Sequence, residues 1–327
     1  MQALLQTGYG STEVFRVDTT ARPTAGPGEV IVKVEAAGID RGTWHLMTGR
    51  PYLMRIMGFG FSAPKEPVAG LDLAGTVVEI GAGVTRFRVG DEVFGIGRGS
   101  FAELARARED KLVRKPRGLS FAEAAVLAVS GGTAIQAIDA AKLVAGERVL
   151  VIGASGGVGT YAVQIAKARG AIVTGVASTS KLATVRAAGA DHVIDYTTTD
   201  VTDVEQRYDV ILDVGGNTPL RRLRRALSPT GRLVFVGGEK GGDWTAGFGR
   251  ILLAMLLKPF VRQRFIMLGS KEHFSHFQRV ADLVEAKQLV PIIDRHIAMR
   301  DVPSALLDLE AGRVRGKIVV EIAQSLR

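Results

Sequence analysis

The feature that most constrains the fold is a short apolar run followed by a glycine-rich turn and a helical pattern. The run Val149 to Ile152 is rich in β-branched residues and ends at a glycine, as a strand buried on both faces does. From Val158 apolar residues recur at helical spacing until Gly170, which is placed to end the helix. A second apolar run, 171–177, follows. This order predicts a βαβ unit.

The turn of this unit carries the spacing Ala154-x-Gly156-x-x-Gly159. A glycine in the turn lets backbone N–H groups approach a pyrophosphate, and a glycine one turn later lets the helix pack closely on the strand. The helix N-terminus adds partial positive charge. A turn with only a structural role is the alternative. We expect a dinucleotide to be bound by Ala154, Ser155, Gly156, Gly157, Val158 and Gly159.

Strands and helices alternate beyond residue 118. A capping box formed by Ser120 and Glu123 precedes an alanine-rich helix. The strands are predicted to begin near Val149, Ile172, His192, Val210, Leu233 and Arg264, and the helices near Thr160, Lys181 and Pro219. Such alternation predicts an α/β fold with a doubly wound parallel sheet. A helix expected over 272–288 would close that sheet.

Residues 1–117 have a different pattern, because short strands are separated by turns. These strands are predicted over 28–37, 73–81, 90–95 and 99–105. They indicate a β-rich, barrel-like domain, to which the C-terminal strand 315–322 is expected to return. The predicted domains are therefore 1–117 with 291–327, and 118–290.

Composition excludes some chemistry and favours a few partners. The 327 residues include no cysteine, which excludes disulfides, thiolate catalysis and cysteine-bound zinc. The net charge of +9 favours a polyanionic cofactor or a nucleic acid. The basic run 221–225 is interleaved with leucines at helical spacing, which indicates an amphipathic helix with a solvated face. No nucleic-acid partner is expected.

No targeting or membrane-spanning segment is recognisable. The N-terminus lacks a basic region followed by an apolar core, and we expect a cytoplasmic protein. The longest apolar run, 251–257, is too short to span a bilayer, so no stable membrane insertion is expected. Because basic residues flank this run, it could contact a membrane surface, line a pocket or form a subunit contact.

Several motifs occur in the order and spacing of one family. They lie at 30–34, 38–52, 67–75, 90–93, 130–134, 153–159, 189–196 and 315–319. On these motifs the chain resembles the medium-chain dehydrogenase/reductases, and among them the zinc-free quinone oxidoreductase-like branch. The resemblance implies a GroES-like catalytic domain, a Rossmann domain, a nicotinamide cofactor and a homodimer.

The zinc-binding positions of the family are altered. Zinc-dependent relatives place a Cys after Gly-Val, and a Gly-His-Glu before the barrel strand. By resemblance those positions are Asp40 and Gly70-Leu71-Asp72 here. A catalytic zinc needs three protein ligands, and Leu71 has no lone pair. We therefore expect no metal, and we interpret His273 and His276 as surface or packing residues.

The residues after the second Rossmann strand favour NADPH over NADH. NAD-binding enzymes place an Asp or Glu there, whereas this chain has Ser178, Thr179 and Lys181. Hydroxyl donors and a positive charge suit a 2′-phosphate. A solvated helix start is the alternative for Ser178 and Lys181. The family resemblance adds Tyr196 near this phosphate.

The resemblance also suggests cofactor contacts outside the glycine-rich turn. Thr133 would lie near the nicotinamide, beside the strand end at Gly237. Lys317 would contact the cofactor or form a solvated strand end. Asn217 is interpreted as a cap for the following helix, and the loop 241–249 is expected to shape the substrate pocket.

Without a metal, hydrogen bonds must polarise the substrate carbonyl. The resemblance implies hydride transfer to a quinone or an α,β-unsaturated carbonyl. Tyr52 is the first candidate donor, because a phenol can donate both a hydrogen bond and a proton. His45 is a second candidate, with packing as the alternative for both residues. An ionised Asp40 would accept hydrogen bonds, so it stabilises an oxyanion only when protonated.

Two other functions stay open. Asp40 stands where many relatives have Asn, which favours an NAD(P)-dependent alcohol or aldehyde oxidoreductase. The other alternative is a cofactor-binding protein whose main role is RNA or membrane binding.

Overall fold

The computed structural model describes residues 1–52, 55, 60–201, 206–216, 218–237 and 248–322. Asn217 and most of the loop 241–249, for which the sequence suggested roles, lie outside these residues. The chain divides into two compact units, Met1–Gly132 with Glu272–Arg327, and Thr133–Lys271. Each unit is described separately below.

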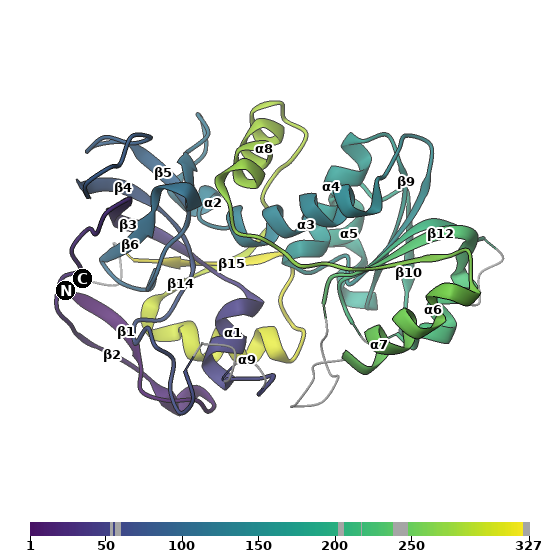
Figure 1. Cartoon of the computed structure of the whole chain (residues 1–327), viewed down its shortest axis with the longest axis horizontal. Helices are drawn as coiled ribbons and strands as arrows, with labels where there is room; N and C mark the ends of the chain where they lie inside the picture. The colour runs from purple at the N-terminus through teal and green to yellow at the C-terminus, as the bar shows by residue number, and fades with distance from the viewer. Residues whose placement is uncertain (53–54, 56–59, 202–205, 217, 238–247, 323–327) are drawn as a thin grey trace. The chain divides into compact units, whose positions relative to one another are not determined.

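The second unit contains a six-stranded parallel sheet with the order β10-β9-β8-β11-β12-β13 (Figure 1). In chain order this is third, second, first, fourth, fifth, sixth, which is the strand order of a Rossmann fold. The predicted doubly wound sheet is therefore confirmed. The strands are β8 (Arg148–Ile152), β9 (Ile172–Ala177), β10 (His192–Asp195), β11 (Tyr208–Asp213), β12 (Leu227–Phe235) and β13 (Arg264–Met267).

The helices of this unit follow the predicted pattern. Leu220, Leu223 and Leu227 are buried while most of the neighbouring arginines are exposed, so the amphipathic reading of 220–227 is confirmed. Gly170 has a φ of +78° and follows the helix end, as predicted. The helices are α3 (Ala128–Ala141), which begins in the first unit, α4 (Gly157–Ala168), α5 (Leu182–Ala187), α6 (Leu220–Ala226) and α7 (Phe248–Leu257), with the 3₁₀ turns η4 (Thr179–Lys181) and η5 (Lys258–Phe260).

The first unit is built on a seven-stranded sheet with the order β14-β15-β3-β4-β5-β7, in which β6 also pairs with β3. The C-terminal strand β15 pairs with β3, which confirms its predicted return to the barrel. The strands are β3 (Glu29–Ile39), β4 (Asp72–Ile80), β5 (Glu92–Ile96), β6 (Leu104–Arg108), β7 (Leu112–Arg114), β14 (Ile293–Ala298) and β15 (Lys317–Glu321), beside the separate pair β1 (Gln2–Gln6) and β2 (Phe15–Thr19). The strand predicted over 99–105 is wrong in its bounds, because β6 begins only at Leu104.

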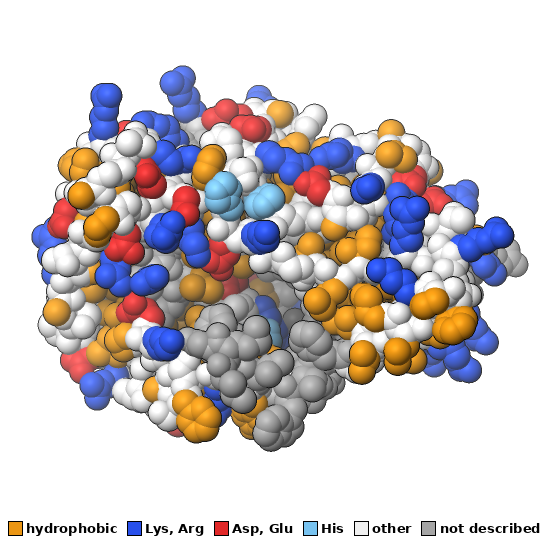
Figure 2. All heavy atoms as spheres, in the orientation of Figure 1, with side chains coloured by type: hydrophobic (Ala, Val, Ile, Leu, Met, Phe, Trp, Pro, Cys, Tyr) orange, Lys and Arg blue, Asp and Glu red, His pale blue; other side chains and the backbone are white. Residues whose placement is uncertain are grey.

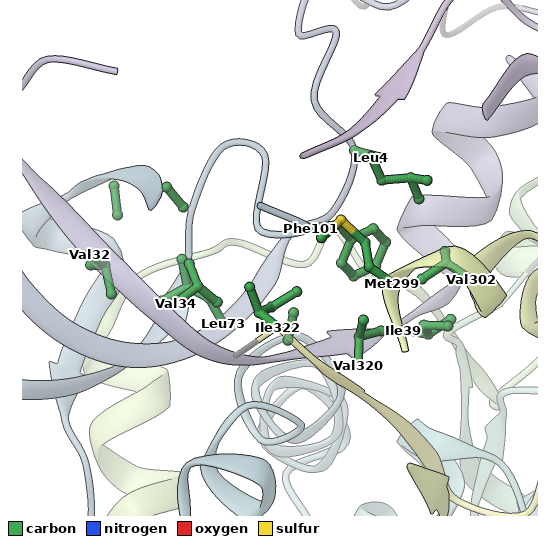
Figure 3. Packing of buried hydrophobic residues seen from close by; sticks show 14 of the residues in the cluster. Leu4, Val32, Val34, Ile39, Leu73, Phe101, Met299, Val302, Val320 and Ile322 are labelled. Carbon is green, nitrogen blue, oxygen red and sulfur yellow. The ribbon is translucent and has the colours of Figure 1, made fainter. Parts of the chain in front are cut away.

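One hydrophobic core holds this unit together. Side chains from β3, β4 and β15 meet Leu4, Phe101 and Met299 (Figure 3). Burying large apolar side chains of this kind is the main favourable contribution to folding. The helices around the sheet are α1 (Arg41–Thr48), α2 (Phe121–Ala124), α8 (Phe274–Glu285) and α9 (Val302–Glu310), with the 3₁₀ turns η1 (Thr12–Val14), η3 (Glu109–Lys111) and η6 (Met299–Asp301).

Two segments lie in a different unit from the one the sequence suggested. Residues 118–132 belong to the first unit, because α2 packs on β3, β4 and β15. The helix expected over 272–288 is α8, and it packs on β7 rather than closing the parallel sheet. The capping box of Ser120 and Glu123 is present, but the helix it begins ends at Ala124.

Candidate active site

The glycine-rich turn lies at the carboxyl end of β8. Gly153 has a φ of +82°, and its carbonyl accepts a hydrogen bond from the Gly156 N–H at 3.2 Å. A Cβ on Gly159 would lie 2.1 Å from the Gly153 oxygen, so only glycine lets α4 approach the strand this closely. Gly156 caps α4, whose first turn has N–H groups without partners inside the helix.

The remaining turn residues lie between β8, β9 and the start of α4. Ala154 is fully buried, and its N–H donates to the Val176 oxygen at 3.0 Å, which joins the turn to β9. Ser155 is nearly buried, while Gly157 and Val158 are partly exposed at the start of α4. The structure thus brings all six predicted residues of the turn together.

The loops after β11 and β12 join this turn at the switch point of the sheet. Gly215 donates its N–H to the Ile152 oxygen at 3.1 Å. Gly237 donates to the Asp213 oxygen at 3.1 Å, and a Cβ on Gly237 would lie 2.2 Å from the Val214 oxygen. In doubly wound sheets ligands bind at the carboxyl edge where the strand order reverses, here between β8 and β11.

A buried ion pair fixes the loop after β11. Arg250 of α7 donates through Nη1 to Asp213 Oδ2 at 2.9 Å and to the Thr218 oxygen at 2.8 Å. Burial raises the pKa of the Asp213 carboxyl, and the Arg250 guanidinium opposes that rise. The sequence analysis missed this pair, because Arg250 stood only at the edge of an apolar run.

A carboxylate that the sequence analysis did not consider lies near the predicted phosphate site. Asp195 pairs with Ala177 across β10 and β9, so it lies at the same sheet edge as Thr179. Thr179 Oγ1 donates to Asp195 Oδ2 at 2.5 Å. This hydrogen bond and those from Thr197 lower the pKa of Asp195, which is therefore ionised. The prediction that the Thr179 hydroxyl is available to a phosphate is therefore corrected.

The other residues predicted near the phosphate are placed as follows. Ser178 is partly exposed and precedes η4, where Lys181 is also partly exposed. Tyr196 is 60% exposed, and its N–H donates to the Ala177 oxygen at 3.2 Å. Thr133 lies on α3, where its Oγ1 is 3.4 Å from the Ser270 hydroxyl.

In the first unit, Asp40 caps the N-terminus of α1 and is only 4% exposed. Its Oδ1 accepts a hydrogen bond from the Thr43 N–H at 2.8 Å. Its Oδ2 is buried and has no hydrogen-bond partner within the described part of the chain. A buried carboxyl oxygen without a partner is costly, and it indicates a group that a ligand or a proton satisfies.

A buried ion pair lies in the same unit. Lys317 is 2% exposed, and its ammonium lies 3.0 Å from Asp72 Oδ2 and 3.3 Å from Ser130 Oγ. Asp72 Oδ1 also accepts the Val129 N–H at 2.8 Å. The structure therefore excludes the solvated strand end that was one interpretation of Lys317.

The register of β3 explains this pair. Gly38 faces Asp72 on β4 and Val319 on β15, so Lys317 and Asp72 reach each other beside a residue without a side chain. A Cβ on Gly38 would lie 2.6 Å from the Ala125 oxygen and 3.1 Å from Asp72 Oδ2. Gly38 therefore leaves the space that the ion pair needs.

Two carboxyl groups thus share one buried ammonium. Burial raises the pKa of Asp72 to about 7, the Lys317 ammonium opposes that rise and the Asp40 charge adds to it. Burial also raises the pKa of Asp40, against the opposing effect of Lys317. Lys317 contacts Asp72 directly and so favours the ionised form of Asp72. When one of the two carboxyl groups is protonated, we therefore assign the proton to Asp40.

The two other candidate proton donors lie on or after α1. His45 Nδ1 lies 2.7 Å from the Arg50 oxygen, and its ring meets Trp44 edge-on. Tyr52 is partly exposed, and the Arg55 guanidinium lies 4.7 Å above its ring. The sequence analysis missed Arg55, which also donates through Nε to the Gly49 oxygen at the end of α1.

Among the described residues, no group of three or more His, Asp and Glu side chains could hold a metal ion. His273 caps α8 and accepts a hydrogen bond from the Ser275 N–H at 3.3 Å. This contact fits the interpretation of His273 as a structural residue.

Comparisons with known proteins agree with this fold. The family model for the alcohol dehydrogenase GroES-like domain matches residues 26–117, and that for the zinc-binding dehydrogenase matches residues 188–320. A chloroplastic quinone-oxidoreductase homolog from Spinacia oleracea is 31% identical over 340 residues, covering 98% of this chain and 98% of that protein. A mitochondrial NAD(P)H oxidoreductase from Bos taurus is 32% identical over 359 residues, covering 96% of this chain and 87% of that protein.

One solved structure has the same fold along nearly the whole chain. The quinone oxidoreductase from Coxiella burnetii superposes with a TM-score of 0.86 at 27% identity, covering 98% of this chain and 99% of that one. Together these relatives support an oxidoreductase with a nicotinamide cofactor and a small-molecule substrate. The chain belongs to the medium-chain dehydrogenase/reductase superfamily, as a quinone-oxidoreductase-like member with a GroES-like domain and a Rossmann domain.

Proposed function

We propose that this oxidoreductase uses NADPH and no zinc to reduce quinones or α,β-unsaturated carbonyls. The observation that carries the proposal is the buried Asp40 carboxyl, whose Oδ2 has no partner in the described chain. This residue stands where zinc-dependent relatives have a cysteine ligand. A protonated carboxyl there can supply by hydrogen bonding what a metal supplies as a Lewis acid.

The residues of the second unit fit a dinucleotide. The turn 153–159 and the first turn of α4 would bind its pyrophosphate, with Gly237 and Thr133 toward the nicotinamide. Ser178 and Lys181 would bind the 2′-phosphate, and Tyr196 would lie beside it. A bound nicotinamide supplies a hydride at C4. Asp195 stays ionised beside this site, because Thr179 and Thr197 donate to its carboxylate, so the Lys181 charge is needed to hold a phosphate there.

The charges around Lys317 indicate which residue donates the proton to the substrate. When hydride adds to the conjugated carbon, the electron pair moves to the carbonyl oxygen. Asp40 then donates its proton to the reduced substrate and becomes a carboxylate, which the nearby Lys317 ammonium stabilises. A neutral carboxyl held in an apolar site is an established form of general acid. Tyr52 would donate a second hydrogen bond to the oxygen, and His45 would orient the segment through the Arg50 carbonyl.

The proposal is tested by adding 1,4-benzoquinone, enals, simple aldehydes and alcohols to the purified enzyme and following NADPH and NADH absorbance. We expect NADPH oxidation with quinones or enals, in protein that holds less than stoichiometric zinc by elemental analysis. Turnover of alcohols and aldehydes alone would instead support the alcohol or aldehyde oxidoreductase. A homodimer stays a prediction. A cytoplasmic location stays one too, because two of the relatives named above are chloroplastic and mitochondrial proteins. No described helix has the length and apolarity needed to cross a membrane.

Lys181→Ala is expected to raise KM for NADPH about 10- to 100-fold and to leave KM for NADH unchanged, because only the phosphate needs the lost charge. Initial rates with each cofactor measure the effect. Thr179→Val is the control, since its hydroxyl already donates to Asp195, and it should change neither value much. If Lys181→Ala raised KM equally for NADPH and NADH, the assignment of Lys181 to the 2′-phosphate would be wrong.

Tyr52→Phe is expected to lower kcat about 100-fold with quinones and enals, as removal of one oxyanion donor does. Tyr9→Phe is the matched control, because Tyr9 also lies under Arg55, at 4.4 Å, but its hydroxyl donates to the Gly60 oxygen. Single-turnover rates with saturating NADPH measure both variants. An unchanged kcat in Tyr52→Phe would remove Tyr52 from the mechanism.

A further inference from the structure

The guanidinium of Arg55 contacts both the backbone at the end of α1 and two aromatic rings. Its Nε donates to the Gly49 oxygen at 3.0 Å, and its Nη2 donates to the Thr48 oxygen at 3.1 Å. Its central carbon lies 4.4 Å from the ring centroid of Tyr9 and 4.7 Å from that of Tyr52. One guanidinium can make both kinds of contact, because its hydrogen bonds lie in its plane and leave its face to stack on rings.

The position of Arg55 differs from that of a solvated surface cation. Lys and Arg side chains are spread over the face of the molecule that Figure 2 shows, where water solvates their charges. Arg55 is partly buried, and the carbonyls that it binds belong to Thr48, the last residue of α1, and to Gly49, its C-cap. The carboxyl end of a helix has carbonyls without partners and carries partial negative charge. The end of α1 therefore attracts the guanidinium and holds it in place.

Gly49 leaves the space that this arrangement needs. Its φ is +62°, and a Cβ at this position would lie 2.6 Å from Arg55 Nε and 2.6 Å from Tyr9 Cδ1. Tyr9 is itself held in place, because its hydroxyl donates to the Gly60 oxygen at 3.0 Å. Tyr9 and the end of α1 therefore fix the Arg55 guanidinium independently of Tyr52.

Tyr52 is joined to Arg55 through the backbone as well as through its ring. The Arg55 N–H donates to the Tyr52 oxygen at 3.1 Å, and the guanidinium lies over the phenol ring. The helix whose end Arg55 binds begins at its N-cap, Asp40. Arg55 therefore connects the Tyr52 phenol to the helix that Asp40 caps. Such a connection matters for catalysis, because displacing a reacting group by about 1 Å lowers the rate about 100-fold.

We propose that Arg55 is the positioning residue for Tyr52. Its guanidinium, fixed by the end of α1 and by Tyr9, holds the phenol ring in the orientation in which the hydroxyl donates to the carbonyl oxygen of the substrate. This inference rests on the proposed function, in which Tyr52 donates a hydrogen bond to that oxygen. Arg55 acts through Tyr52 and not on the substrate. A donor that is oriented before the substrate binds needs no reorganisation during the reaction.

Arg55→Met is expected to lower kcat with quinones and enals about 10- to 100-fold. It should leave KM for NADPH unchanged, because the contacts of Arg55 are with α1 and the two tyrosines. Arg55→Lys keeps a charge at the end of α1 but has no planar fork, so kcat should still fall about tenfold. Arg86→Met is the matched control, because the Arg86 guanidinium also lies over an aromatic ring, 3.5 Å from the centroid of Phe274. It should leave kcat unchanged in single-turnover measurements with saturating NADPH.

A double variant separates positioning of Tyr52 from a general structural role. With Tyr52→Phe already in place, Arg55→Met should lower kcat by no more than about threefold further, because the hydroxyl that Arg55 orients is gone. If the two losses multiplied instead, Arg55 would act independently of Tyr52 and the inference would be wrong. Full kcat in Arg55→Lys would also overturn it, since a charge at the end of α1 would then be sufficient.

NMR of the protein with labelled tyrosine gives a measurement that does not depend on turnover. The chain has only five tyrosines, so Tyr→Phe variants assign each ring signal. Arg55→Met should shift the ring signals of Tyr52 and Tyr9 and leave those of the other three tyrosines in place. An unmoved Tyr52 signal would overturn the inference. If the unchanged protein reduced no quinone or enal, the proposed function would fail, and the variants would be compared on the substrate that the protein does turn over.

Discussion

Lys317→Met is expected to lower the free energy of unfolding by about 3–5 kcal/mol, because it leaves the buried Asp72 carboxylate without its counter-ion. Asp72 then keeps only the Val129 N–H as a partner. Urea unfolding at pH 9, where Asp72 is ionised in the unchanged protein, measures the loss.

A double variant separates the ion pair from simple packing. Lys317→Met with Asp72→Asn removes both charges and is expected to recover most of the lost stability, because no uncompensated charge is then buried. Arg114→Met breaks the exposed pair with Asp91 and serves as the control, with a loss within about 1 kcal/mol. If Lys317→Met lowered the free energy of unfolding no more than Arg114→Met does, the pair of Lys317 and Asp72 would be solvated. These two residues would then not influence the protonation of Asp40.

The parts of the fold that sequence could predict are those that local patterns determine. The strand, turn and helix at 149–170 are specified by β-branched residues, by Gly156 and Gly159, and by helical spacing, all within one short segment. The amphipathic pattern of 220–227 is equally local. These interpretations hold because hydrophobic period and glycine positions restrict the backbone before any long-range contact forms.

The parts that sequence could not predict depend on pairs of distant residues. Asp72 and Lys317 are 245 positions apart, and nothing local to Lys317 distinguishes a buried ammonium from a solvated strand end. Asp195 reaches Thr179 only because β10 lies beside β9 in the sheet. The one local signal for the cluster was Asp72, a carboxyl directly before the apolar residues Leu73 and Ala74, since such a residue needs a partner when buried.

The role of Asp40 depends both on its position in the sequence and on its contacts in the structure. Its position in the family pattern indicated a departure from the usual chemistry, and an ionised carboxylate could not stabilise an oxyanion. Its burial raises its pKa and the Glu272 charge adds to that rise, against the opposing Lys317 ammonium, so the neutral acid is the form that this site favours. The departure therefore does not by itself require an alcohol or aldehyde substrate.

Asp40→Asn is accordingly expected to lower kcat about 100- to 10,000-fold, the range that general acids contribute. In the unchanged protein the donor must be protonated, so kcat should be high at low pH and fall as pH rises past the raised pKa of Asp40. Asp40→Asn should remove this alkaline decline, because the amide does not titrate. Steady-state rates with saturating NADPH between pH 5 and 9 measure the profile.

Asp72→Asn provides the matched comparison, because it leaves the Asp40 carboxyl in place and removes only its charged neighbour. Lys317 then loses its ion pair with Asp72 while its charge still acts on Asp40, so the pKa of Asp40 should fall and the decline of kcat should move to lower pH. A merely structural role for Asp72 would lower stability without moving this profile. If both variants kept the original profile, the proton would come from elsewhere, and Tyr52 or His45 would be the residue to examine next.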